Sequence, residues 1–158
     1  MIEYADEHDR PLLIASPSEA FPLRRKTVGA VLCDRRGRAF VRRRVSERGV
    51  ETWDISAETY VRSGEAREEA VGRAVRETLG LSNVPFGEAV PTAFKPAGGN
   101  VSLTLFLAEL PGILPPDSLR EGHFLDREEL VGMAETFPDL FSPVLLWAIG
   151  TGCLWKRR

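Results

Sequence analysis

Residues 53–81 read WDISAETYVRSGEAREEAVGRAVRETLGL and carry the most informative pattern of this chain. The stretch starts like a β-strand, passes through a polar loop around Gly64, and then becomes periodic. Between residues 66 and 79, apolar side chains recur every three or four positions, which predicts an amphipathic helix. Gly80 can end this helix in the left-handed conformation, and Ser63 is the expected N-cap.

The predicted helix has two different apolar sides. One is a stripe of bulky side chains that should face the main core, namely Val71, Val75 and Leu79. The other is a stripe of alanines, which would let another segment of backbone lie close, and consists of Ala66, Ala70 and Ala74. We expect the preceding loop to be that segment.

This stretch resembles the Nudix box. In that motif, a Gly is followed after five residues by a Glu and, after seven more, by Arg-Glu-apolar-any-Glu-Glu-any-Gly-apolar. Six positions of this sequence match, namely Glu65, Arg73, Val75, Glu77, Gly80 and Leu81. Three positions differ, namely Thr59, Ala74 and Thr78, and the last two stand where the family keeps metal-binding carboxylates.

The resemblance extends weakly over about residues 27–149 and implies an α/β fold, the Nudix α/β/α sandwich with a mixed β-sheet. Along the chain we expect a hairpin over 26–45, short strand pieces over 83–97, and a clear strand over 101–109. A short strand, 121–125, should precede a capping box formed by Asp126 and Glu129. The last expected helix spans 141–149, with Ser142 as its N-cap and Pro143 in its first turn.

Length and composition predict one domain over residues 1–158, with 1–25 as an N-terminal arm or strand pair and 26–150 as the core. The net charge of −2 gives no general attraction to nucleic acid polymers or to anionic membranes. The family resemblance implies a small-molecule diphosphate compound as the partner. Two cysteines outside any metal-type pair, and an acidic, polar start, predict a cytoplasmic protein.

The family resemblance implies chemistry at a diphosphate linkage, attacked by water while Mg²⁺ or Mn²⁺ screens the phosphate charge. By match, the candidate catalytic residues are Glu77, Arg73 and Glu65. Glu77 would be the one remaining metal ligand, Arg73 would tie the loop to the helix, and Glu65 would fix the loop. Because two carboxylates are missing, we expect weak metal binding. Further carboxylates that could contribute are Glu68, Glu69, Glu88 and Glu121.

Two sets of charged residues have alternative structural roles. Glu77 could simply pair with Arg73, four residues earlier on the helix, while Glu69 pairs with Arg73 from the other side. The consecutive arginines 42–44 cannot all share one face of a strand. They could be exposed and ion-paired, or Arg42 and Arg44 could bind a ligand phosphate.

The start of the chain is also similar to Nudix proteins close to isopentenyl diphosphate isomerase. That branch needs a Cys and several His around its active site, and residues 53–81 contain neither, so we do not expect isomerase chemistry. Two hypotheses remain. The first is a divergent Nudix-type hydrolase with a depleted metal site, acting on a nucleoside diphosphate linked to another moiety or on a similar compound. The alternative is a catalytically silent Nudix-fold module that binds a phosphorylated ligand or a protein partner.

Overall fold

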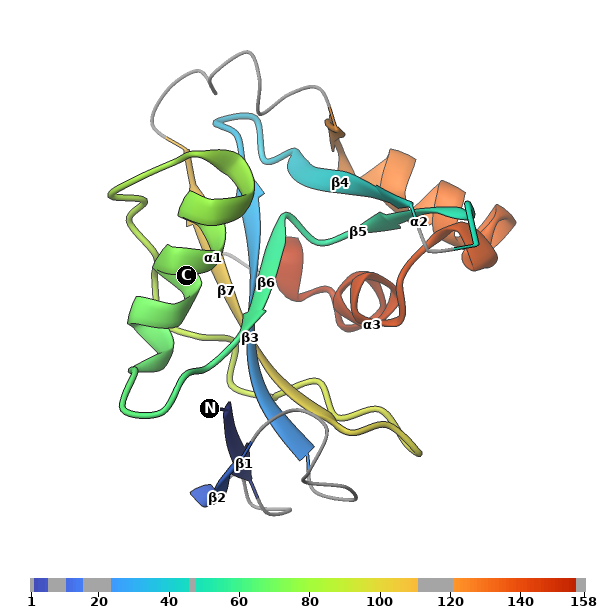
Figure 1. Cartoon of the computed structure of the whole chain (residues 1–158). Coiled ribbons are helices and arrows are strands. Elements are labelled where there is room, and N and C mark those ends of the chain that lie inside the picture. The colour runs from blue at the N-terminus through green and yellow to red at the C-terminus, as the bar shows by residue number, and fades with distance from the viewer. Residues whose placement is uncertain (1, 6–10, 16–23, 46–47, 111–120, 156–158) are drawn as a thin grey trace.

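The computed structural model describes residues 2–5, 11–15, 24–45, 48–110 and 121–155. Within these ranges, eight strands form one mixed sheet that is flanked by three α-helices (Figure 1). The strands are β1 (Ile2–Ala5), β2 (Pro11–Ala15), β3 (Arg24–Cys33), β4 (Ala39–Val45), β5 (Glu51–Asp54), β6 (Ala57–Tyr60), β7 (Val101–Glu109) and β8 (Gly122–Leu125). The helices are α1 (Arg67–Leu79), α2 (Arg127–Thr136) and α3 (Pro143–Thr151), with short 3₁₀ turns at Pro138–Leu140 and Cys153–Trp155.

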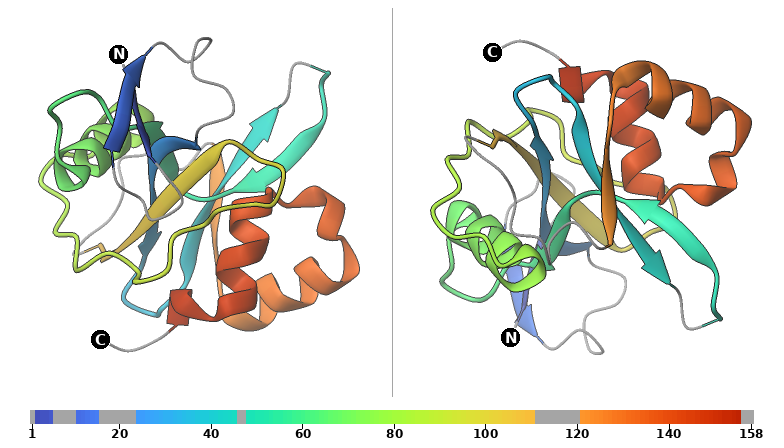
Figure 2. Two further views of the ribbon diagram at one scale, coloured as in Figure 1. Left: turned by 90° about the horizontal axis from the view of Figure 1, so that it is seen from below. Right: turned by 90° about the horizontal axis from the view of Figure 1, so that it is seen from above.

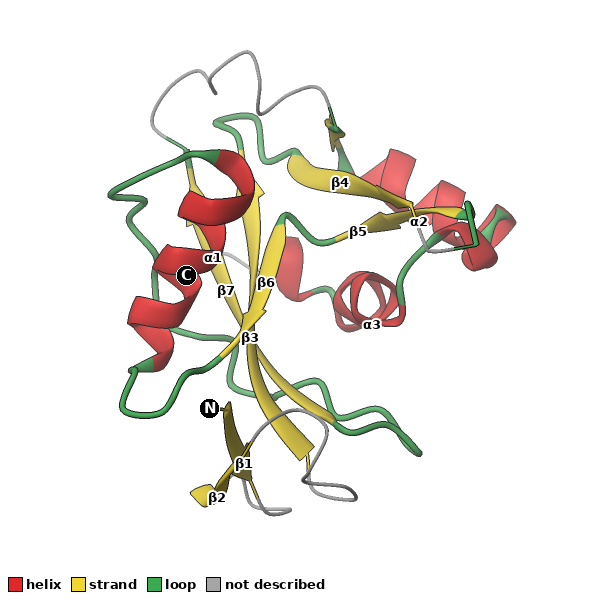
Figure 3. Cartoon of the chain, viewed as in Figure 1, coloured by secondary structure: helices red, strands yellow, loops and turns green. Residues whose placement is uncertain are grey.

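Strand β3 organises the sheet. Along one edge it pairs in parallel with β7, from Arg25 opposite Val101 to Cys33 opposite Glu109. Its other edge pairs in turn with β1, β6 and β4, all antiparallel. Strands β5 and β8 then pair with β4 and form a second lobe of the sheet (Figure 3). The apolar run after Lys26 suits this central position because both faces of β3 are covered.

Helix α1 covers one face of the sheet, whereas α2 and α3 cover the other (Figure 2). The first core layer joins the α1 side chains Val71, Val75 and Leu79 to alternate residues of β3, and the second joins the other β3 residues to α2 and α3. Gly29 lets the Ile55 side chain of the second layer pack directly on β3, since a Cβ there would lie 2.5 Å from Cδ1 of Ile55. The predicted α/β/α sandwich with a mixed sheet is confirmed.

The start of α1 differs from the prediction. The N-cap is Ala66, with no side-chain cap, so the prediction of Ser63 as N-cap is wrong. The loop before α1 contains a turn, in which the N–H of Glu65 donates to the carbonyl of Arg62 at 3.0 Å. Ser63 lies within this turn. The end of α1 is as expected, because Gly80 has a φ of 69° and its N–H donates to the carbonyl of Arg76.

Most other elements lie where the sequence places them. The hairpin, the strand pair at the start of the chain, the capping box of α2 and the Ser142 cap of α3 are all present. Of the strand pieces expected over 83–97, only an isolated antiparallel bridge between Phe94 and Leu103 forms, and no continuous strand is present. That segment instead runs beside β7 through isolated backbone hydrogen bonds, such as Val90 to Leu105 and Phe94 to Leu103, each 2.8 Å. Prolines at 85, 91 and 96 cannot donate backbone hydrogen bonds, which explains why no continuous strand forms.

Candidate functional site

The best-defined polar structure in the molecule surrounds Arg73, which lies in the middle of α1 and is only 7% exposed. Its guanidinium binds the Glu65 carboxylate with two hydrogen bonds of 3.0 Å, from Nε and Nη2. Nη2 also donates to the carbonyl of Tyr60 at 2.8 Å, and Nη1 donates to Oγ1 of Thr59 at 3.2 Å. One side chain therefore ties β6, the following loop and α1 together, and we call Arg73, Glu65, Thr59 and Tyr60 the clamp.

The clamp is electrostatically well matched. Hydrogen bonding by Arg73 holds the pKa of Glu65 below its usual value, and Glu65 in turn raises the pKa of Arg73. Glu65 also accepts a hydrogen bond from the backbone, because the N–H of Arg62 donates to its Oε1 at 3.1 Å. Charge-assisted, bidentate pairs of this kind fix geometry as well as adding energy. The structural roles expected for Glu65 and Arg73 agree with these contacts, whereas any part they play in catalysis stays a prediction.

Glu77 lies one turn beyond Arg73 on α1, and its side chain is 56% exposed. Its Oε2 is 3.6 Å from Nη1 of Arg73, so the alternative ion pair exists, although an exposed pair of this length contributes little. Arg73 pairs with Glu65 on its other side, and the expected contact with Glu69 does not form. The weak hold of Arg73 leaves the Glu77 carboxylate accessible to a ligand.

The two positions that depart from the family pattern have different environments. Ala74 is 1% exposed and packs in the core layer beneath α1, whereas Thr78, one turn later, is exposed. A methyl group offers no ligand, and a hydroxyl brings no charge. Within the described part of the chain, no three His, Cys, Asp or Glu side chains gather as metal ligands. These residues do not fit a resident ion held by protein alone. Glu77 fits only as a single carboxylate for an ion whose other ligands are water and phosphate oxygens.

The arginines of β4 are divided by the pleat of the strand. Arg43 points to one face and lies 3.4 Å from Glu51, whereas Arg42 and Arg44 share the other face. Nη1 of Arg44 donates to both Asp54 Oδ2 at 2.9 Å and Glu58 Oε1 at 3.0 Å.

Arg42 differs from Arg44, because its Nε is buried and has no hydrogen-bond partner among the described residues. Burial, together with the neighbouring charge of Arg44, lowers the pKa of Arg42. This N–H is enclosed by protein and Arg42 is not among the residues that line the pocket described next, so anion binding by Arg42 stays a prediction.

A pocket of about 320 Å³ adjoins the clamp and is lined by Thr27, Arg44, Glu58, Thr59, Tyr60 and Val101. Thr59 connects the two features, because its hydroxyl accepts from Arg73 while its side chain lines the pocket. The pocket thus brings Arg44 close to the clamp. Glu58 is a lining residue that the sequence analysis missed. Its position immediately before Thr59, the first residue of the motif, could have indicated that it lies near the site. Its pairing with Arg44 could not be predicted, because the two residues are fourteen positions apart in the sequence.

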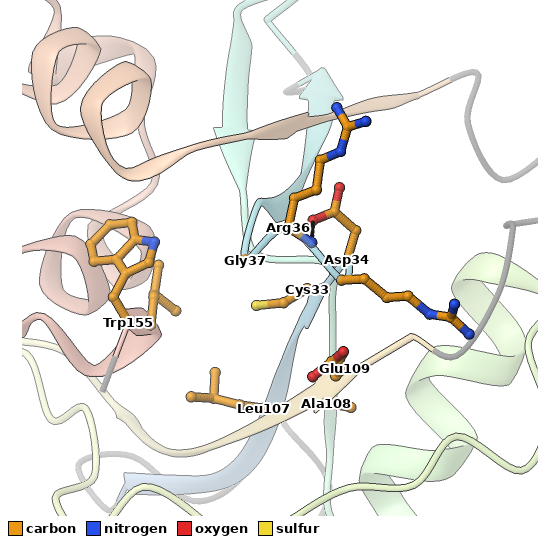
Figure 4. Close-up of a pocket in the computed structure, with 10 residues that line it drawn as sticks. Cys33, Asp34, Arg36, Gly37, Leu107, Ala108, Glu109 and Trp155 are labelled. Atoms are coloured by element: carbon orange, nitrogen blue, oxygen red, sulfur yellow. Dashed lines mark hydrogen bonds between the residues drawn. The ribbon is translucent and has the colours of Figure 1, made fainter. Parts of the chain in front are cut away.

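A larger cavity, about 630 Å³, lies at the turn between β3 and β4, at the far end of β3 from Thr27 (Figure 4). The polar groups of this cavity mainly stabilise the turn. Asp34 holds the turn by accepting hydrogen bonds from Arg36 and Arg38. Burial, and then the charges of Asp34 and Glu109, raise the pKa of Cys33 to about 11, which keeps the thiol protonated. The clamp and the smaller pocket therefore form the candidate site.

A mixed sheet between helices, with a loop clamped to the helix that follows it, defines the class of Nudix-fold proteins. The family model described as NUDIX domain matches residues 23–145 of the chain. The protein belongs to the NUDIX domain family. No curated protein matches it. In the described residues, no helix has the length and apolar composition needed to cross a membrane.

Several solved structures are similar to this one. DR0079 from Deinococcus radiodurans has a TM-score of 0.71 and 20% identity, and the match covers 98% of this chain and 99% of that chain. The MutT protein from Methanosarcina mazei Go1 has a TM-score of 0.59 and 20% identity, covering 81% and 94%. A NUDIX hydrolase from Nitrosomonas europaea has a TM-score of 0.58 and 14% identity, covering 84% and 90%. At these identities, the likeness establishes the shared fold.

Proposed function

We propose that this protein is a divergent Nudix-type hydrolase that acts on a diphosphate linkage and depends only weakly on Mg²⁺ or Mn²⁺. One observation carries the proposal: the Arg73 guanidinium contacts Glu65, Thr59, Tyr60 and Glu77 at the edge of a pocket. The loop and helix that present the reacting groups in this family are thus held in place. The small-molecule partner implied by the family resemblance and the cytoplasmic location predicted from the sequence belong to the same proposal.

In this proposal, the side chains of the site have different roles. Arg73 and Glu65 keep the loop rigid, so that the phosphates meet a preformed surface. Arg42, which shares a face of β4 with Arg44, would donate to a phosphate oxygen through its terminal nitrogens, while Arg44 is held by Asp54 and Glu58 at the pocket wall. A divalent ion, when bound, screens phosphate charge and polarises the attacked phosphorus. Glu77 is the carboxylate exposed to hold it.

The alternative is a catalytically silent module that binds a phosphorylated ligand or a protein partner. The burial of Ala74 favours this alternative. Position 74 packs in the core, so a small movement of the helix would not bring another carboxylate to the place where the family pattern has one. The clamp and the pocket would then serve recognition alone. The two proposals agree on where a phosphorylated ligand binds and differ on whether its diphosphate linkage is broken.

The test is ³¹P nuclear magnetic resonance of the full chain with UDP-glucose and with ADP-ribose, each with and without Mn²⁺. Hydrolysis adds water across the P–O–P linkage and releases two phosphomonoesters. Turnover that falls in Glu77→Gln but persists in the matched exposed variant Glu51→Gln would support the hydrolase. Binding without turnover would support the silent module, and absence of both would refute a diphosphate ligand.

A further inference from the structure

The pocket beside the clamp contains a carboxylate, Glu58, that the proposed chemistry does not use. Its Oε1 accepts a hydrogen bond from Arg44, whereas no partner for Oε2 exists among the described residues. Glu58 lines the pocket and its side chain is 30% exposed. Burial, and next the nearby charge of Asp54, raise the pKa of Glu58. The ionised carboxylate is therefore short of hydrogen-bond donors.

Glu58 is held in place by a chain of contacts that reaches across the molecule. Asp54 is 1% exposed, and its Oδ1 accepts from the Ser142 hydroxyl at 2.7 Å and from the Ile55 N–H at 2.8 Å. Its Oδ2 binds Arg44, which in turn binds Glu58. Because Ser142 caps α3, this chain fixes Arg44, and through it Glu58, against the second lobe of the sheet.

The charges around Glu58 leave the pocket with little affinity for an anion. Among the described residues that line the pocket, Arg44 is the one cation, and two carboxylates already share its Nη1. Arg25 lies outside the lining, where its guanidinium donates to the Tyr60 hydroxyl at 2.9 Å and covers the Tyr60 ring. That hydroxyl and the Thr59 hydroxyl each accept a hydrogen bond from an arginine, so their own O–H groups can donate. A neutral group with several hydroxyls matches this set of donors and acceptors.

We propose that Glu58 is a specificity-determining residue, whose free oxygen accepts hydrogen bonds from the group attached to the diphosphate. The site then takes a neutral, hydroxyl-bearing group and discriminates against the same group carrying a carboxylate. This inference rests on the proposed function, since it assumes that the phosphates lie at the clamp. A carboxylate on the ligand would face Glu58 in a partly desolvated pocket, where like charges repel strongly.

A matched pair of ligands tests the proposal. UDP-glucose carries a hydroxymethyl group where UDP-glucuronate carries a carboxylate, and the two compounds are otherwise identical. Titration calorimetry of the intact protein should show UDP-glucose binding at least about tenfold more tightly. In Glu58→Gln, which keeps size and can still accept from Arg44, the ratio should fall toward one. Glu51→Gln, which removes an exposed carboxylate on the opposite face of the sheet, should leave the ratio unchanged.

Inorganic pyrophosphate separates failure of this inference from failure of the proposed function. Equal affinities for the two uridine compounds in the parent protein, or a ratio unchanged in Glu58→Gln, would overturn the role of Glu58. Binding of pyrophosphate with no binding of either uridine compound would also overturn it, while leaving the phosphate site intact. If pyrophosphate does not bind either, the proposed function itself fails. A melting curve of Glu58→Gln shows whether the variant is folded.

Discussion

The two polar regions of α1 differ sharply, although they lie within two turns of each other. In the clamp, a buried Arg73 satisfies Glu65, Thr59 and the Tyr60 carbonyl in a bidentate, charge-assisted arrangement. On the neighbouring face, Ala74 is part of the core and Thr78 is exposed, so Glu77 stands without the carboxylates that the family pattern places beside it. The comparison shows that the clamp which positions the loop is kept, although two carboxylate positions of the family pattern hold Ala74 and Thr78.

The largest expected effect comes from breaking the clamp. Arg73→Met leaves Glu65 half-buried and uncompensated, so the free energy of unfolding should fall by about 3 kcal/mol. Urea denaturation measures this loss. Arg76→Met, on the exposed side of the same helix, should stay within about 0.5 kcal/mol of the parent. Equal midpoints for the two variants would mean that the clamp is not a stabilising feature.

A smaller effect is expected from the core side of α1. Val75 is fully buried beneath the helix, so Val75→Ala should cost about 1–3 kcal/mol of unfolding free energy. Val50→Ala is the matched control, because Val50 is 53% exposed and should change stability by less than about 0.5 kcal/mol. If the Val75 variant unfolds at the parent's urea midpoint, α1 is rotated relative to the sheet in solution.

The clamp should also make stability depend on acid. The pKa of Glu65 is lowered in the folded protein, so its contribution is present above the unfolded value of about 4.3. That contribution should disappear as the pH falls through the lowered pKa of the folded state. Glu65→Gln should remove this part of the loss of unfolding free energy in acid. The difference in unfolding free energy between the parent and the variant, measured by urea denaturation, should therefore narrow below pH 4. A gap that stays constant from pH 7 to pH 3 would contradict the assignment.

The weakest effect is that of metal on the parent protein. With one accessible carboxylate, a dissociation constant for Mn²⁺ of about 1 mM or weaker is expected, on the order of −4 kcal/mol. At that affinity, about 1 mM Mn²⁺ would stabilise the fold by only about 0.4 kcal/mol. Thermal melting with and without the ion checks this, and micromolar binding that Glu77→Gln abolishes would show that other ligands complete a site.

Much of this arrangement could be predicted because it depends on local pattern. The period of residues 66–79, Gly80, and the caps of the later helices are set by neighbours in the sequence, and the structure places them as expected. The Ser63 cap failed because Glu65 N–H closes a turn on Arg62, which no periodicity reveals. Glu58 and Asp54 were missed as partners of Arg44 because that network depends on how β4, β5 and β6 meet in space.

The central claim, that the metal-binding face of α1 is depleted while its scaffold is kept, is tested most directly by restoring one carboxylate. Thr78 is the position to change, because Ala74 is buried and a Glu there would place a charge in the core. Calorimetric titration with Mn²⁺ should show Thr78→Glu binding at least about tenfold more tightly than the parent. Thr78→Gln should behave like the parent, and Glu77→Gln in the Thr78→Glu background should cancel the gain. If Thr78→Glu binds Mn²⁺ no better than Thr78→Gln, positions 77 and 78 do not face a common site, and the account is wrong.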